Sequence, residues 1–128
     1  MYFITINSIT MKFVKTTSKK WEAKPGGYSK KIFLNERDLN YPGGLVQELK
    51  IKPGDICANH YHKKQTEIFY FTSTNGWFEV EGKKIDIEKG DVLVVEPNDM
   101  HRAGNESDKD FVYVAFKFNY SSEDSYYE

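Results

Sequence analysis

Two histidines and a glutamate have the residue types and the spacing of a metal site. His60 and His62 are two positions apart, so in a strand their side chains project from the same face. Glu67 follows five residues after His62, beyond a short polar turn that can return its carboxylate to the two imidazoles. Imidazole nitrogens and carboxylate oxygens suit divalent transition metals. The pattern therefore predicts a metal-binding group.

His101 is the remaining histidine of the chain. A single strand histidine is more often a surface or core residue than a ligand, so His101 alone is weak evidence. It follows a Gly-Asp segment and a turn at Pro97, where the chain can come back alongside the other three residues. We therefore expect His101 to complete a group of three histidines and one glutamate.

Short strands must position these side chains. Apolar and aromatic residues recur with a period close to two in seven segments, which are residues 32–34, 44–52, 66–72, 77–80, 84–87, 91–96 and 111–118. Turns rich in Gly, Pro, Asn and Asp separate them, and no ten-residue stretch has a helical stripe. Many short strands at this spacing predict an all-β antiparallel sandwich or barrel.

Two segments resemble the two motifs of the cupin superfamily. Residues 54–67 read G-x5-H-x-H-x4-E and close at Gly76, and residues 90–105 contain a Gly-Asp strand, a proline turn, His101 and Asn105. The resemblance implies a double-stranded β-helix, or jelly-roll, cupin barrel. It implies a single cupin domain over residues 1–128, with its core motifs at 54–76 and 90–105. It also implies that His60, His62, Glu67 and His101 bind one divalent transition metal, which is Fe, Mn, Ni, Co, Zn or Cu.

The sequence departs from the motifs at two turns. Eight residues separate Glu67 from Gly76 where six are usual, which predicts a longer hairpin tip. Glu96 and Asn98 replace a proline and a glycine of the second turn. Asn tolerates a positive φ better than most residues, so we expect that turn to be kept.

The alternation of side chains along each strand predicts which other residues face the expected metal site. Gln47 shares the apolar face of the strand over residues 44–52, and a buried polar side chain is costly unless a partner satisfies it. Gln47 is therefore a candidate to contact a substrate or a metal-bound water, the alternative being a hydrogen bond to the backbone. Tyr113 is a weaker candidate. Cys57 is expected on the face opposite the ligands, and no Lys or Arg is expected to point inward, although Arg102 can reach the rim.

Composition narrows the function classes. The chain has 128 residues and a formal net charge of −1, which argues against binding to nucleic acid or a membrane surface through bulk positive charge. One cysteine excludes an intramolecular disulfide and a multi-cysteine zinc site, and favours a cytoplasmic location. No apolar run approaches the roughly 20 residues that span a bilayer.

The two ends of the chain leave alternatives open. Residues 1–10 are either an extension upstream of a start at Met11 or part of a chain that starts at Met1. Residues 121–128 are polar, and we expect a frayed tail or an edge that docks on a partner. The strand-like residues 2–6 can add to a partner's sheet, and small jelly rolls expose sheet faces, so we expect a homodimer.

The sequence thus favours a metal-dependent enzyme acting on a small organic molecule, of oxygenase-like or isomerase/lyase-like type. The alternative is a non-catalytic cupin that binds or senses a small ligand or a metal. Fold does not choose between these functions. In both cases we expect a small-molecule partner and neither nucleic acid nor membrane.

Overall fold

The structure, a computed structural model, describes residues 2–6 and 9–128. Nearly all of its elements are strands, and the alternating segments of the sequence each form one. The strands are β1 (Tyr2–Ile6), β2 (Ile9–Phe13), β3 (Glu22–Lys24), β4 (Tyr28–Leu34), β5 (Leu45–Ile51), β6 (Ile56–Tyr61), β7 (Thr66–Phe71), β8 (Trp77–Val80), β9 (Lys83–Asp86), β10 (Val92–Val95), β11 (His101–Gly104), β12 (Phe111–Phe118) and β13 (Tyr126–Tyr127).

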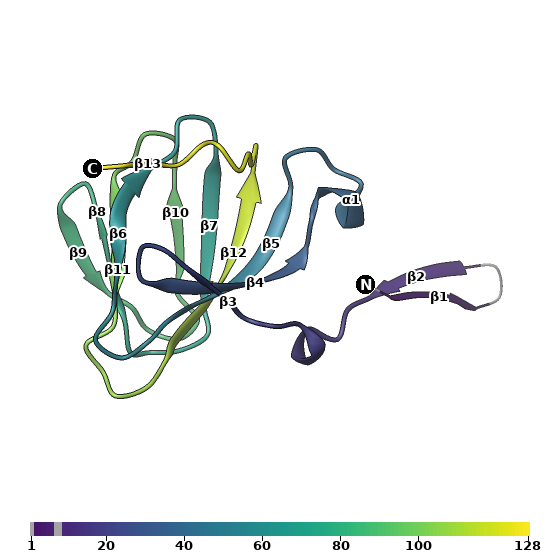
Figure 1. The fold of residues 1–128 in the computed structure, drawn as a ribbon, viewed down its shortest axis with the longest axis horizontal. Coiled ribbons are helices and arrows are strands. Elements are labelled where there is room, and N and C mark those ends of the chain that lie inside the picture. Colours follow the sequence, from purple (N-terminus) through teal and green to yellow (C-terminus); the bar gives the residue numbers. More distant parts are fainter. Residues whose placement is uncertain (1, 7–8) are drawn as a thin grey trace.

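Two antiparallel sheets form the barrel (Figure 1). One has six strands in the order β10-β7-β12-β5-β4-β3, and the other has five in the order β13-β6-β11-β8-β9. Neighbours in each sheet are often distant in sequence, as in the pairs β12·β5 and β11·β6. This pairing brings the two histidine-bearing segments together.

The N-terminal strands form a separate two-stranded hairpin. β1 pairs with β2, and Figure 1 shows the hairpin extending away from the barrel. The predicted strand over residues 2–6 is therefore present, paired within its own chain. Its addition to a partner's sheet stays a prediction.

Helical structure is confined to short turns in the described residues. A 3-10 turn spans Thr16–Ser18, and α1 spans Glu36–Leu39. The side chain of Asn35 accepts a hydrogen bond from the backbone N–H of Asp38, and the Asp38 carboxylate accepts one from the N–H of Asn35, which caps α1. None of the described helices is long enough to cross a membrane.

Aromatic residues fill the barrel interior. Phe69, Phe71, Phe78, Phe111 and Tyr113 are each 3% exposed or less, and neighbouring rings lie 4.9–6.5 Å apart. The alternation on β5 and β7 is confirmed, because Gln47 is buried among the apolar residues of β5 while Tyr70 on β7 is 45% exposed. Rings in tilted and edge-on contact add to the free energy of burial.

Strand register arranges the interior in layers. Glu67 is opposite Lys117 at one end of the β7·β12 ladder, and Phe69 is opposite Ala115 one layer deeper. Ala115 in turn pairs with Gln47 of β5. The small Ala115 therefore lies between two larger inward side chains, directly beneath the polar end of the barrel.

Two connections differ from the predicted hairpins. β6 and β7 belong to different sheets, so the residues between them, 62–65, cross from one sheet to the other. The longer link over 72–76 also crosses between sheets, at the end of β7 away from Glu67. Its Ser73 side chain donates to the backbone of Val112 on β12, and its Asn75 side chain donates to the backbone of Lys109 in the loop before β12. A side chain at Gly76 would overlap the buried ring of Phe111, which explains the glycine that closes the motif.

Candidate metal centre

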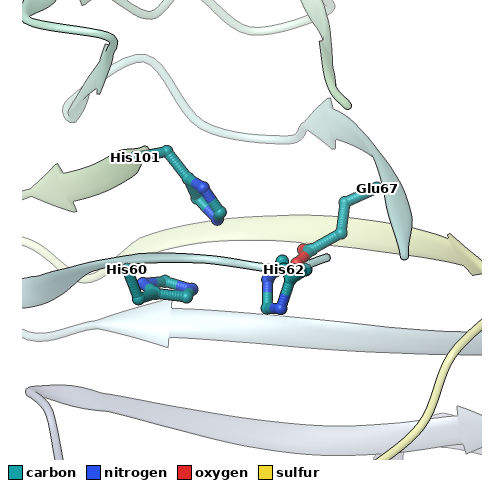
Figure 2. A group of neighbouring side chains, drawn as sticks. All are labelled: His60, His62, Glu67 and His101. Carbon is teal, nitrogen blue, oxygen red and sulfur yellow. The ribbon is translucent and has the colours of Figure 1, made fainter. Parts of the chain in front are cut away.

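The four residues predicted to bind a metal come together at one end of the barrel (Figure 2). His60 lies on β6, His62 just after it, Glu67 on β7 and His101 at the start of β11, so both sheets contribute. Each residue offers one ligand atom, and these atoms all lie within 4.8 Å of one another. His62, Glu67 and His101 are buried and His60 is half-buried. This group can hold a metal ion.

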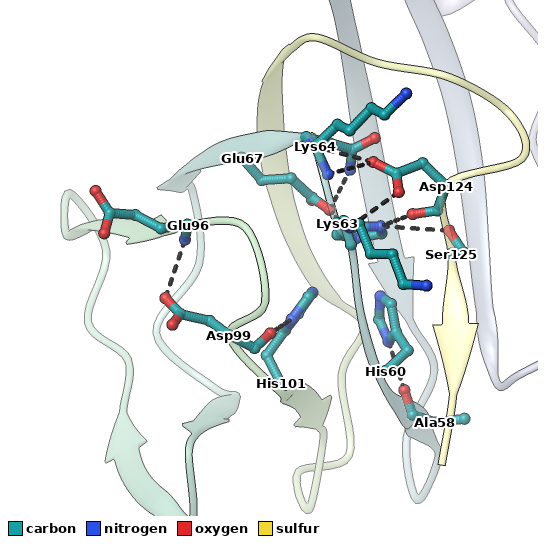
Figure 3. A network of polar contacts seen from close by, with 12 residues as sticks. Ala58, His60, Lys63, Lys64, Glu67, Glu96, Asp99, His101, Asp124 and Ser125 are labelled. Atoms are coloured by element: carbon teal, nitrogen blue, oxygen red, sulfur yellow. Dashed lines mark hydrogen bonds and ion pairs between the residues drawn. The ribbon is translucent and has the colours of Figure 1, made fainter.

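Backbone carbonyls orient the three imidazoles. The Nδ1 atoms of His60, His62 and His101 donate to the carbonyl oxygens of Ala58, Asp124 and Asp99 at 2.7, 2.7 and 2.8 Å (Figure 3). A ring that donates through Nδ1 and is neutral carries a free lone pair on Nε2. Such contacts to the far nitrogen fix the tautomer of metal-binding histidines.

Two of the three inward imidazole nitrogens lack a hydrogen-bond partner among the described residues. Nε2 of His62 and Nε2 of His101 are buried and make no hydrogen bond to the described residues. Nε2 of His62 lies 2.6 Å from Oε1 of Glu67, without the alignment of a hydrogen bond. Buried polar atoms without partners are costly and rare. A divalent cation between them would satisfy all four groups, so this donor set fits one.

The local electrostatics keep the donors in their metal-binding forms. Burial, together with the nearby His101, lowers the pKa of His60 to about 4, and burial also lowers the pKa of His101. Both rings are thus neutral at pH 7. Burial favours the protonated form of Glu67, but the Lys117 ammonium and the His62 imidazole outweigh it and hold the pKa of this carboxyl below its usual range.

A tight turn positions His101. The N–H of Asp99 donates to the carbonyl of Glu96, and the Asp99 carboxylate accepts from the N–H of Glu96. Asn98 adopts a φ of 73°, as expected for the residue that replaces a glycine. Its N–H donates to the carbonyl of His62 at 2.6 Å, so the turn is tied directly to the other histidine segment.

The prediction for Cys57 was wrong. Cys57 lines the same cavity as His60 and His62 and is 8% exposed, whereas Ile56 is 51% exposed. The pairs His101↔His60 and Ala103↔Cys57 show one extra residue on β6, which is a β-bulge. A bulge shifts the alternation, so both Cys57 and His60 face inward.

A cavity of about 60 Å³ opens beside the four residues. Both predicted candidates, Gln47 and Tyr113, line it, and each is 3% exposed. The Gln47 amide makes no hydrogen bond to the described residues, so the backbone alternative is not found there. Burial raises the pKa of the Tyr113 hydroxyl well above its usual value, and that of Tyr28 on the cavity wall is also raised by burial. These hydroxyls stay protonated at neutral pH.

The expectation of no inward cation was also wrong. Lys117 lines the cavity and is paired in register with Glu67. It continues the inward alternation of Phe111, Tyr113 and Ala115 along β12, a signal that was present in the sequence. Arg102 reaches the rim as expected, where its guanidinium makes two hydrogen bonds of 3.1 Å to the Glu79 carboxylate.

The C-terminal segment is not a frayed tail. β13 pairs with β6, Asp124 is 5% exposed, and Ser125 and Tyr127 line the cavity. Residues 121–128 therefore dock on their own barrel. The prediction of a frayed tail, which rested on the polarity of the segment, was wrong.

Gln65 is a residue of the site that the sequence analysis did not identify. It is 1% exposed and donates through Nε2 to Oε1 of Glu67 at 2.6 Å.

Comparison with known proteins agrees with this architecture. The sequence model of the cupin domain matches residues 47–117. The chain belongs to the cupin family. The solved structures that resemble it share the double-stranded β-helix barrel, which confirms the fold that the motifs imply.

Proteins that resemble this cupin in sequence or in fold include some that are named for a ligand or a reaction. An oxalate-binding protein of Thermotoga maritima is 27% identical over 82 residues, covering 64% of this chain and 68% of the relative. The solved structure of a predicted oxalate decarboxylase from the same organism has a TM-score of 0.77 at 21% identity, covering 84% of this chain and 98% of that one. The polyketide cyclase RemF of Streptomyces resistomycificus has a TM-score of 0.75 at 14% identity, covering 89% of each chain.

Proposed function

We propose that this cupin is a metal-dependent enzyme that acts on a small organic molecule carrying a carboxylate. The observation that carries the proposal is the convergence of three inward imidazoles and the Glu67 carboxylate on one point of a cavity. His60, His62, Glu67 and His101 would hold one divalent transition metal. Four protein donors leave two positions of an octahedral ion open.

The charge of the cavity supports the choice of a carboxylate. Four ligands that include one carboxylate leave a divalent ion with a net positive charge, and Lys117 adds a cation at the same end of the barrel. An anionic group is therefore favoured over a neutral or cationic one. A cavity of about 60 Å³ suits a compact molecule, and a relative is named for binding oxalate.

The bound metal would polarise an oxygen of the ligand or lower the pKa of a coordinated water. The chain's own residues would then orient the ligand. The Tyr113 hydroxyl is held protonated by burial, which makes it a hydrogen-bond donor or general acid rather than a base. The Gln47 amide lines the cavity and supplies both a donor and an acceptor. The surrounding Phe69 and Phe78 exclude water from the inner end.

The experiment loads the protein with Mn²⁺ or Fe²⁺ and offers a panel of small mono- and dicarboxylic acids. Turnover is followed by proton NMR, and oxygen uptake with an electrode. We expect turnover of at least one acid, lost in His62→Ala. Turnover of neutral analogues at equal rates would contradict the assignment of a carboxylate substrate.

The alternative function is a non-catalytic cupin that binds or senses a small ligand or a metal. Its support is the scarcity of groups that exchange a proton near neutral pH. Apart from the metal-binding residues, the titratable groups of the cavity lining are the thiol of Cys57, the hydroxyls of Tyr28, Tyr113 and Tyr127, whose pKa values are all raised chiefly by burial, and the cations of Arg102 and Lys117. Tight binding of a carboxylate to the metal-loaded protein without any turnover would favour this alternative.

We also propose a cytoplasmic homodimer. The outer face of the six-stranded sheet exposes a band of apolar side chains, among them Tyr70, Val92, Val94, Phe116 and Phe118. These residues are neighbours in the β10·β7 and β7·β12 registers, and such a patch is typical of an interface. Light scattering should give twice the chain mass of 14.9 kDa, and Phe116→Glu should lower it toward one chain.

A further inference from the structure

The C-terminal segment, residues 121–128, contacts the candidate metal centre although it lies beyond the residues 47–117 that match the cupin domain. We propose that this segment is a strap that sets the orientation of His62 and closes one wall of the cavity, with Asp124 as the positioning residue. The proposal rests on the metal site proposed above. Its evidence comes from contacts that the family motifs do not contain.

Asp124 anchors the strap to the segment between two of the metal-binding residues. Its carboxylate accepts hydrogen bonds from the backbone N–H groups of Lys63, Lys64 and Gln65 at 2.9, 2.9 and 3.0 Å (Figure 3). Hydrogen bonds to an ionised carboxylate are stronger than neutral ones. The three donors lie between His62 and Glu67, so the carboxylate fixes the backbone that carries both.

The backbone of the strap orients His62 directly. The carbonyl of Asp124 accepts the Nδ1 hydrogen bond of His62 at 2.7 Å, and Oγ of Ser125 lies 3.4 Å from the same nitrogen. His60 and His101 use carbonyls that are only two residues away in the chain, whereas the partner of His62 is 62 residues away. The tautomer and angle of His62 therefore depend on docking of the strap.

The strap also forms a wall of the cavity. Tyr127 lines it and stacks on the ring of His60, with centroids 5.4 Å apart and an interplanar angle of 29°. Tyr126 pairs with Tyr61 of β6, and the Asn59 amide donates to the Glu128 carboxylate at 2.8 Å. Removal of residues 121–128 would thus uncover His60 and widen the entrance.

The first test compares Asp124→Asn with Glu123→Gln. Both variants remove one negative charge from adjacent positions, but Glu123 is exposed and makes none of the anchoring contacts. We expect Asp124→Asn to bind Zn²⁺ about 10- to 100-fold more weakly in competition with a chromophoric chelator, because partners of metal-binding histidines typically contribute that much. We expect Glu123→Gln to bind Zn²⁺ like the wild type.

The second test uses the metal-free protein, so that it stands apart from the proposed function. Amide hydrogen exchange at residues 63–65 should accelerate at least tenfold in Asp124→Asn, and imidazole nitrogen NMR should show that His62 loses its preference for the Nδ1–H tautomer. If the amides of residues 63–65 stay protected in Asp124→Asn and the His62 tautomer is unchanged, the proposed role of the strap is wrong. If the wild type binds no metal but Asp124→Asn still shows both changes, the metalloenzyme proposal is wrong and the positioning role of the strap is supported.

A truncation after Tyr120 removes the whole strap, and its test applies once the truncated protein is shown to fold. Circular dichroism should show the barrel intact, and Zn²⁺ affinity should fall at least as far as in Asp124→Asn. The widened entrance should also admit larger dicarboxylates, such as phthalate, to the metal-loaded protein. Wild-type Zn²⁺ affinity in the folded truncated protein would contradict a positioning role for the strap.

Discussion

Lys117→Met separates two effects of charge in the cavity. The substitution keeps an apolar stem of similar length and removes the ammonium that lies in register with Glu67. That ammonium repels a metal cation but attracts a carboxylate ligand. We therefore expect opposite changes: Mn²⁺ affinity is unchanged or increased, and the affinity of the Mn²⁺-loaded protein for oxalate falls.

The size of the loss follows from the exposure of Lys117. Two unit charges about 4 Å apart interact by about 4 kcal/mol at an effective dielectric constant of about 20. Lys117 is half-buried, and solvent screening reduces a pair of this kind to about 1–2 kcal/mol. Every 1.4 kcal/mol is tenfold in Kd, so oxalate should bind roughly 5- to 30-fold more weakly.

The assay is isothermal titration calorimetry of oxalate into the Mn²⁺-loaded wild type, Lys117→Met and a control, Lys83→Met. Lys83 is an exposed lysine on β9 and is absent from the cavity lining. Oxamide, a neutral analogue of oxalate, should not distinguish Lys117→Met from the wild type. Equal losses of Mn²⁺ and oxalate affinity would refute the electrostatic argument, because they would indicate a structural role for Lys117.

Two of three further predictions concern residues that line the cavity, and the third concerns Gly76 at the opposite end of the barrel. Burial raises the pKa of the Cys57 thiol to about 12, so iodoacetamide should alkylate the folded protein at pH 8.5 roughly 10³-fold more slowly than the urea-unfolded chain; equal rates would mean that the thiol is exposed. Tyr113→Phe should lower turnover about 10²-fold while Mn²⁺ binding is kept, and full activity would remove Tyr113 from the mechanism. Gly76→Ala should reduce the free energy of urea unfolding by about 1–3 kcal/mol, because the new methyl group overlaps Phe111; wild-type stability would show that the ring moves freely.

The sequence was sufficient to predict the barrel and the four converging residues. The alternation of apolar and polar residues along β5 and β7 indicates which side chains are buried, so Gln47 and Glu67 were correctly expected inside the barrel. The spacing of His60, His62 and Glu67 depends only on local geometry and the motif. Lys117 was predictable too, since the same alternation along β12 points it inward, but a charged residue was not expected at a buried position.

Other features depend on contacts between distant parts of the chain. The bulge that turns Cys57 inward arises from pairing of β6 with β11, and the residues of β6 alone carry no sign of it. Asp124 stands in a polar, acidic segment that is typical of a mobile terminus. Its burial results from three backbone N–H donors about 60 positions earlier in the chain, which no local pattern reports.

Elemental analysis tests the central claim most directly. The untagged protein is purified without chelator, and its metal content is measured beside that of His62→Ala. We predict about one equivalent of Fe, Mn, Ni, Co, Zn or Cu in the wild type and loss of that metal in the variant. A wild type that contains no metal, and takes up none on titration with Mn²⁺ or Zn²⁺, would contradict the metal centre.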